Sequence, residues 1–107
     1  MLGHLFESLA TLCVRVCAQA AEATLGHLRT RNGDHEVDLV VVRDDGSVLA
    51  VEVKLAATVE DRDTTHLHWL ASHLGPRLLD AVVINTGPQA YRRPDGIGVV
   101  PLALLGP

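Results

Sequence analysis

The chain has 107 residues, of which 48% are hydrophobic and 21% are charged, and its formal net charge is −4. This length suits one small domain over residues 1–107 with a single core, and the interspersed charges argue against a disordered chain. A dedicated nucleic-acid binder usually has a basic excess, so contact with DNA would here need a metal ion or a local cluster of arginines.

No apolar run approaches the roughly 20 residues that span a membrane, and no signal peptide is apparent. The two cysteines, Cys13 and Cys17, are four residues apart in a stretch with helical spacing. They could present two thiolates on one helix face to a metal, but two small buried hydrophobic side chains are the simpler interpretation. Nothing indicates an oxidising compartment, so we expect a cytoplasmic protein.

Residues 2–21 predict a helix, because large apolar side chains recur every three or four positions. This first stripe consists of Leu2, Leu5, Phe6, Leu9, Leu12, Cys13 and Val16. A second stripe of smaller residues lies nearly opposite and consists of Gly3, Glu7, Ala10, Val14 and Ala18. A helix that is apolar on two sides should be covered on two sides. The second stripe is therefore a candidate surface for a homodimer or a partner protein.

Three strands are expected in the middle of the chain. A weakly patterned strand lies around residues 25–31, before turn-forming residues, and residues 37–43 and 47–55 are two clear strands rich in valine. Short connections between them favour an antiparallel meander.

The second half of the chain predicts a helix over residues 57–74, a buried strand over 80–87 and a final edge strand over 97–100. The step from the third strand through this helix to the fourth should be a right-handed parallel crossover. A sheet that is apolar on both faces needs helices on both faces. The chain therefore predicts a three-layer α/β/α domain with a mixed central sheet, in the order αβββαβ with a further strand at its end.

The loop Asp-Asp-Gly at residues 44–46 decides how the two valine strands pair. If it is a three-residue loop with its glycine in the left-handed conformation, Arg43 pairs with Ser47. The numbers of opposed residues then have a constant sum, so Asp38 faces Glu52 directly. A two-residue loop would send these two acids to opposite faces of the sheet.

The same register places Glu36 opposite Lys54, the only lysine in the chain. Alternation puts eight residues on one face, namely Glu36, Asp38, Val40, Val42, Val48, Ala50, Glu52 and Lys54. Facing carboxylates with Cβ atoms roughly 5 Å apart repel each other, so one has a raised pKa or a cation lies between them. Mg²⁺ is commonly held by one or two carboxylates and substrate phosphates, and Lys54 would touch what the ion binds.

A plainer interpretation is also open. Glu36 and Lys54 could form a cross-strand ion pair, with Asp38 and Glu52 solvated at the rim of the sheet. Spacing alone does not separate rim charges from a metal site.

Asp38, followed by Glu52-x-Lys54 on the next strand, resembles the motif of the PD-(D/E)xK (restriction-endonuclease-like) nuclease superfamily. The order of elements and an acid on the first helix, Glu7, agree with it. The segments GHLFESL, GDHEVDLVVV, AVEVKLA, HLHWLASHLG and VVINTG look like a nuclease-like domain of unknown function. That domain lies at the C-terminus of many prokaryotic AAA-type ATPases. Val37 replaces the proline of the motif, and the chain has no P-loop.

This resemblance implies a restriction-endonuclease-like fold and hydrolysis of DNA phosphodiester bonds with Mg²⁺ or Mn²⁺. Asp38 and Glu52 would be metal ligands, and Lys54 would position or activate the attacking water. Glu7 would be an auxiliary metal ligand or would hold a water. DNA and an AAA-type ATPase are the partners it implies. The alternative is a catalytically silent nuclease-like module that binds DNA, a partner ATPase or itself.

Four arginines are candidates for contact with nucleic acid. Arg29 and Arg31 lie on the strand before the acids and could meet phosphates. Arg92 and Arg93 share a loop with Tyr91, where stacking and charge could hold a single strand. Surface arginines in a loop usually have no specific role, which is the competing interpretation.

The second predicted helix carries three histidines. His66 and His68 are two positions apart, so they point in different directions and make a poor metal pair. His66 and His73 share a face near Trp69 and could line a substrate groove, although a solvated or packing role is the simpler interpretation.

Overall fold

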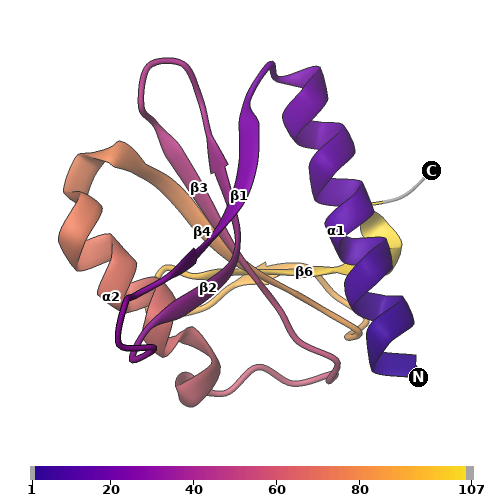
Figure 1. Ribbon diagram of the computed structural model, residues 1–107. Coiled ribbons are helices and arrows are strands. Elements are labelled where there is room, and N and C mark those ends of the chain that lie inside the picture. The colour runs from indigo at the N-terminus through magenta and orange to yellow at the C-terminus, as the bar shows by residue number, and fades with distance from the viewer. Residues whose placement is uncertain (1, 106–107) are drawn as a thin grey trace.

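Within residues 2–105, which the computed structural model describes, six strands form one sheet in the order β1-β2-β3-β4-β6-β5. The strands are β1 (Thr24–Arg29), β2 (Glu36–Val42), β3 (Val48–Val53), β4 (Leu78–Asn85), β5 (Tyr91–Arg92) and β6 (Gly98–Pro101). Two helices, α1 (Leu2–Ala20) and α2 (Thr65–Leu74), cover opposite faces of this sheet (Figure 1). Three single turns of 3-10 helix complete the chain: η1 (Asp61–Thr64), η2 (Gly75–Arg77) and η3 (Leu102–Leu104).

The predicted α/β fold with a mixed sheet is confirmed. β1, β2 and β3 form the antiparallel meander, and β4 pairs with β3 in parallel after the crossover through α2. None of the helices within residues 2–105 is long and apolar enough to cross a membrane.

The C-terminal part of the sheet differs from the prediction. The strand expected at the edge, β6, lies between β4 and β5, so β5 forms the edge. A two-residue strand has no periodicity that a sequence pattern could detect. The second helix is also shorter than expected, because η1 precedes α2 and the helix begins at Thr65.

The prediction of which side of α1 faces the sheet is wrong. The small-residue stripe packs on the sheet, where Ala10, Val14 and Ala18 are buried together with Phe6. Four large residues of the other stripe are exposed, namely Leu5, Leu9, Leu12 and Val16, whereas Phe6 of that stripe is buried. Small side chains let the helix approach the valine-rich sheet closely, so size was a misleading signal of burial. The small-residue side therefore contacts the chain's own sheet and is not free for a partner.

The core has two parts, one on each face of the sheet. Under α1, the buried side chains come from Phe6, Ala10, Val14, Ala18, Leu39, Val41, Val51 and Ile84. Under α2, they come from Val37, Ala50, Val59, Leu67, Leu70, Ala81, Val83, Ile97 and Val99. Strand β2 contributes to both parts, as expected for a strand covered on two faces.

A bulge interrupts the alternation of β2. Gly26 pairs with Val40 and Leu28 pairs with Val37, so two residues of β2 oppose the one residue between them on β1. Those two residues are Asp38 and Leu39. Because of the extra residue, Val37 packs in the core under α2 while Leu39 packs in the core under α1. The prediction that Asp38 and Val40 share one face is therefore wrong. Val40 packs with Ala50 under α2, whereas Asp38 lines a cavity next to α1.

Two valines on α1 test which face of the helix supports the fold. Val14 is 7% exposed and Val16 is 55% exposed. Val14→Ala should lower the free energy of unfolding by about 2 kcal/mol, because it leaves a cavity against the sheet. Val16→Ala should change it by less than about 0.5 kcal/mol. Urea unfolding of dilute protein measures both, and an equal or larger loss at Val16 would contradict the observed orientation.

Candidate metal centre

The loop between β2 and β3 has the predicted geometry. The Arg43 amide donates to the Ser47 carbonyl at 2.9 Å, and Gly46 has a φ of 87°. The paired residues run from Val42 with Val48 to Leu39 with Val51, all in the predicted register. The three-residue loop is confirmed, and it fixes which residues meet at the far end of the hairpin.

Asp38 and Glu52 meet where the ladder between β2 and β3 ends. The Asp38 amide donates to Glu52 Oε1 at 3.2 Å, and the Val53 amide donates to Asp38 Oδ2 at 2.8 Å. Each carboxylate thus accepts a hydrogen bond from the backbone of the other strand. These two bonds take over from the backbone ladder, which stops one residue earlier.

The pair cannot carry two full charges without cost. Burial of Glu52, followed by the charge of Asp38, raises the pKa of Glu52 to about 8, and Glu36 adds a smaller repulsion. The amide of Asp38 acts in the opposite direction by donating to Glu52. In the absence of a cation, Glu52 therefore keeps its proton at neutral pH.

Lys54 does not pair with Glu36, and that prediction is wrong. β3 ends at Val53, and the Lys54 amide donates to the carbonyl of Ile84 on β4. The Lys54 ammonium contacts the carboxylate of Asp63, in η1, at 2.5 Å. The chain turns away from β2 at this point, so the register of the hairpin no longer determines the partner of Lys54.

Asp63 is a site residue that sequence reasoning missed. Its carboxylate also accepts a hydrogen bond from the Glu60 amide at 2.8 Å. Burial raises the pKa of Asp63, but the hydrogen bonds from Lys54 and the Glu60 amide outweigh it and hold this pKa below its ordinary value. Asp63 lies in the early turns of the predicted helix, and no spacing rule connects it with Lys54.

Glu7 reaches the site from α1. Together with Thr11 it lines a cavity of about 200 Å³, whose other walls are Asp38, Leu39 and Val53. Within residues 2–105, no three His, Cys, Asp or Glu side chains gather closely enough to hold a metal. A cation here would therefore have Asp38 and Glu52 as protein ligands, with Glu7 beside the cavity rather than in a three-carboxylate cluster.

Two of the four candidate arginines are held by acids of the same chain. Arg92 donates to both carboxylate oxygens of Asp80, at 2.6 and 3.1 Å. Arg93 pairs with Asp61 and Asp95 and donates to a backbone carbonyl at 2.9 Å. These bonds fasten the loop that follows β5 to the body of the domain. Arg29, at the end of β1, and Arg31, in the following turn, are exposed.

Three of the histidines form an aromatic cluster around Trp69. His35 stacks on Trp69 with ring centroids 4.2 Å apart, and its Nδ1 lies 3.3 Å from Nδ1 of His66. His73 lies on the other side of Trp69, at 4.5 Å. Sequence reasoning grouped the helical residues correctly but missed His35, which comes from the turn before β2. His68 instead contacts Asp95 at 2.8 Å.

Both cysteines are free thiols, with Cys13 half-buried and Cys17 exposed, so the predicted burial is wrong for Cys17 and only partly confirmed for Cys13.

The raised pKa of Glu52 should make the free energy of unfolding of the cation-free protein depend on pH. The unfolded chain loses the proton on Glu52 near pH 4.5, whereas the folded chain keeps it until about pH 8. The free energy of unfolding should therefore fall as the pH rises from about 4.5 through about 8. Glu52→Gln should reduce this fall, because its side chain stays neutral. Urea unfolding in EDTA across this range measures both proteins, and identical pH profiles would contradict the raised pKa.

The comparisons with known proteins identify a family whose description names no activity. The profile of DUF4143, described as a domain of unknown function, matches residues 2–105 and so includes Glu7, Asp38, Glu52 and Lys54. No curated protein and no solved structure gives a significant match. The expected likeness to a domain of unknown function is confirmed in this form. The chain belongs to the DUF4143 family.

Proposed function

We propose that this domain is a nuclease of the PD-(D/E)xK type that hydrolyses DNA phosphodiester bonds with Mg²⁺ or Mn²⁺. The observation that carries the proposal is the meeting of Asp38 and Glu52 where the ladder between β2 and β3 ends, with Lys54 two residues beyond Glu52. Holding two half-buried carboxylates against each other lowers stability unless a cation uses them. The raised pKa of Glu52 is the sign of that cost.

The donor set suits a hard divalent cation. Mg²⁺ prefers oxygen ligands and is commonly bound by one or two carboxylates, with waters and substrate phosphates completing its shell. Asp38 and Glu52 would hold it, and binding would release the proton on Glu52 because a ligating carboxylate is ionised. When bound, the ion would polarise a phosphoryl oxygen and favour ionisation of a bound water.

Lys54 would supply positive charge beside the reacting phosphate. Its ammonium has three N–H donors, and the contact with Asp63 uses one of them. The remaining donors can stabilise charge that develops on a phosphate oxygen or orient the attacking water. Asp63 thus acts as a positioning residue, because it fixes the direction of the lysine side chain.

Glu7 and Thr11 would hold a water at the rim of the cavity next to Asp38.

The proposed substrate is DNA, and the proposed partner is an AAA-type ATPase that would deliver or move it. Arg29 and Arg31 are the better candidates for phosphate contacts, because Arg92 and Arg93 are already held by acids.

A catalytically silent module that binds DNA or protein is the second candidate. It is favoured by the close Lys54–Asp63 contact, which offsets the charge of the ammonium within the chain itself. The net charge of −4 also disfavours tight binding of DNA without a cation.

Calorimetric titration of Mn²⁺ into the protein tests the ligand assignment. The wild type should bind one ion, and Asp38→Asn should weaken binding on the order of 100-fold because it removes one of two anionic ligands. Glu36→Gln is the matched control, since Glu36 is a nearby exposed acid outside the pair. Equal affinity in wild type and Asp38→Asn would rule out this site.

Cleavage of labelled single-stranded, duplex and branched DNA tests the chemistry. Lys54→Ala should slow cleavage on the order of 100-fold while leaving Mn²⁺ affinity nearly unchanged, because it removes transition-state charge and no ligand. Intact Mn²⁺ binding with no cleavage of any DNA would support the silent module instead.

A further inference from the structure

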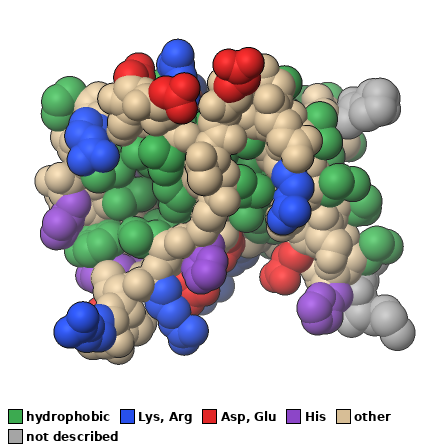
Figure 2. Space-filling view, turned by 45° about the horizontal axis from the view of Figure 1, so that its top comes forward, with side chains coloured by type: hydrophobic (Ala, Val, Ile, Leu, Met, Phe, Trp, Pro, Cys, Tyr) green, Lys and Arg blue, Asp and Glu red, His purple; other side chains and the backbone are tan. Residues whose placement is uncertain are grey.

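An apolar ridge runs along the outer side of α1. Leu5, Leu9, Leu12 and Val16 are 57%, 44%, 55% and 55% exposed. Figure 2 shows hydrophobic side chains along the right-hand edge of the molecule, where α1 lies. Single exposed leucines are ordinary, but four large apolar side chains in one row on one helix are not.

The spacing of the ridge is that of a helix-pairing seam. Its residues follow one another at intervals of four, three and four positions, which is the a/d repeat of helices that pack side by side. The seam itself contains no charged or polar residue. The opposite side of α1 is already used, since Phe6, Ala10, Val14 and Ala18 pack on the sheet.

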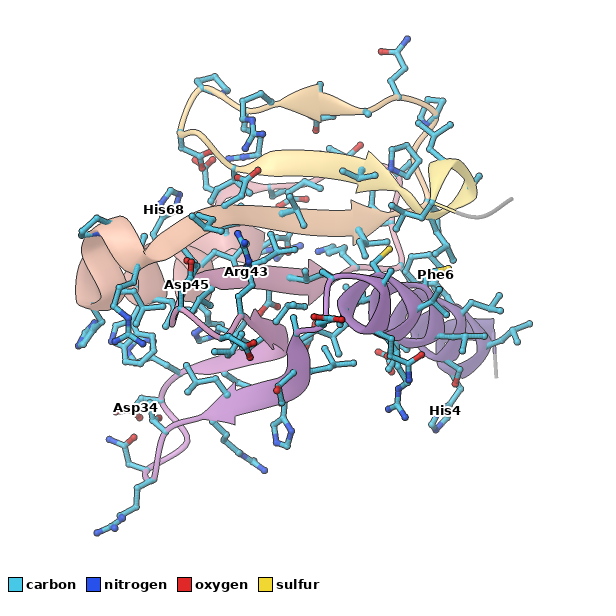
Figure 3. All side chains as sticks on the ribbon, turned by 90° about the horizontal axis from the view of Figure 1, so that it is seen from above. His4, Phe6, Asp34, Arg43, Asp45 and His68 are labelled. Atoms are coloured by element: carbon cyan, nitrogen blue, oxygen red, sulfur yellow. The ribbon has the colours of Figure 1, made fainter. Side chains whose placement is uncertain are left out.

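Apolar surface continues beside the ridge. A cavity of about 390 Å³ opens between α1 and the sheet, and Cys13 and Cys17 form its wall next to the ridge. Its other walls include Leu79, Val82 and Leu105. Seen from above, α1 lies toward the β1–β3 side of the sheet (Figure 3). It also covers Ile84 of β4, and the cavity beside it opens over Leu79 and Val82 of the same strand. The ridge and this groove therefore form one continuous apolar surface.

We propose that α1 pairs with α1 of a second copy of this chain, antiparallel about a two-fold axis. In that arrangement Leu9 packs against Leu12 of the second copy, and Leu5 packs against its Val16. Both contacts occur twice by symmetry, so the four ridge residues fill the seam with no apolar position left over. The proposal does not depend on the proposed nuclease activity.

The amount of surface favours a second copy as the occupant. A half-exposed leucine offers roughly 90 Å², so the ridge and the groove rim offer on the order of 500 Å² per copy. A two-fold contact would then bury about 1,000 Å² in total, near the lower limit for a specific interface. We therefore expect a weak dimer with a dissociation constant on the order of micromolar.

Sedimentation equilibrium with a charge-pair design tests both the contact and its direction. The wild type should approach twice the chain mass of 11.5 kDa as concentration rises. Leu9→Glu alone and Leu12→Arg alone should each be monomeric, because each would place two charges against leucines in a homodimer. An equimolar mixture of the two variants should dimerise again. In the mixed dimer, the introduced acid meets the introduced base and the native Leu9 and Leu12 meet once.

Tyr91→Glu is the matched control, because Tyr91 is an exposed hydrophobic residue on β5, at the edge of the sheet. It should dimerise like the wild type. Unchanged circular dichroism and urea midpoints show that the variants remain folded, as expected for exposed positions. A wild type that stays monomeric at a protein concentration about 100-fold above the expected dissociation constant would overturn the proposal. Dimers that persist in Leu9→Glu, or a mixture that stays monomeric, would overturn the antiparallel α1 contact.

Discussion

The contact between Asp38 and Glu52 is the interaction on which the proposed site depends. Two carboxylates meet where β2 and β3 separate, and each is partly stabilised by a backbone amide of the opposite strand. Those two hydrogen bonds do not offset the cost of ionising Glu52, since its pKa remains raised to about 8. A purely structural pair of acids could be replaced by apolar residues at little cost. The proposed divalent cation would take the place of the proton on Glu52 and would give the pair a use.

Three other parts of the fold position the side chains around this pair. The loop at residues 44–46 sets the register of β2 and β3. The bulge at Asp38 and Leu39 lets β2 fill both cores while it presents Asp38 beside Glu7 of α1. On the other side, the turn before α2 supplies Asp63, which holds Lys54. The outer ridge of α1 is separate from all of these contacts, so association through it would leave the carboxylate pair accessible.

Much of this was predictable from local rules. Valine-rich runs predict the strands, and a glycine at the third loop position predicts the register. The helical pattern between the third and fourth strands predicts the crossover. The Asp38–Glu52 meeting follows from counting along the hairpin. The Lys54–Asp63 contact does not, because it joins residues on different elements through a turn that no register governs. The bulge was equally hidden, since it depends on β1 pairing with one residue fewer. The orientation of α1 was predicted wrongly because close packing on a flat valine surface favours Ala10 and Ala18 over leucine.

The nuclease proposal requires a divalent cation between Asp38 and Glu52. Anomalous diffraction from crystals soaked in Mn²⁺ locates such an ion without reference to activity. We expect one anomalous peak within about 2.0–2.3 Å of an oxygen of each carboxylate, with Lys54 nearby and not coordinated. An absence of any peak there, or a peak at His35 and His66 alone, would contradict the proposal. The two acids would then be a structural pair, and the nuclease proposal would lose its basis.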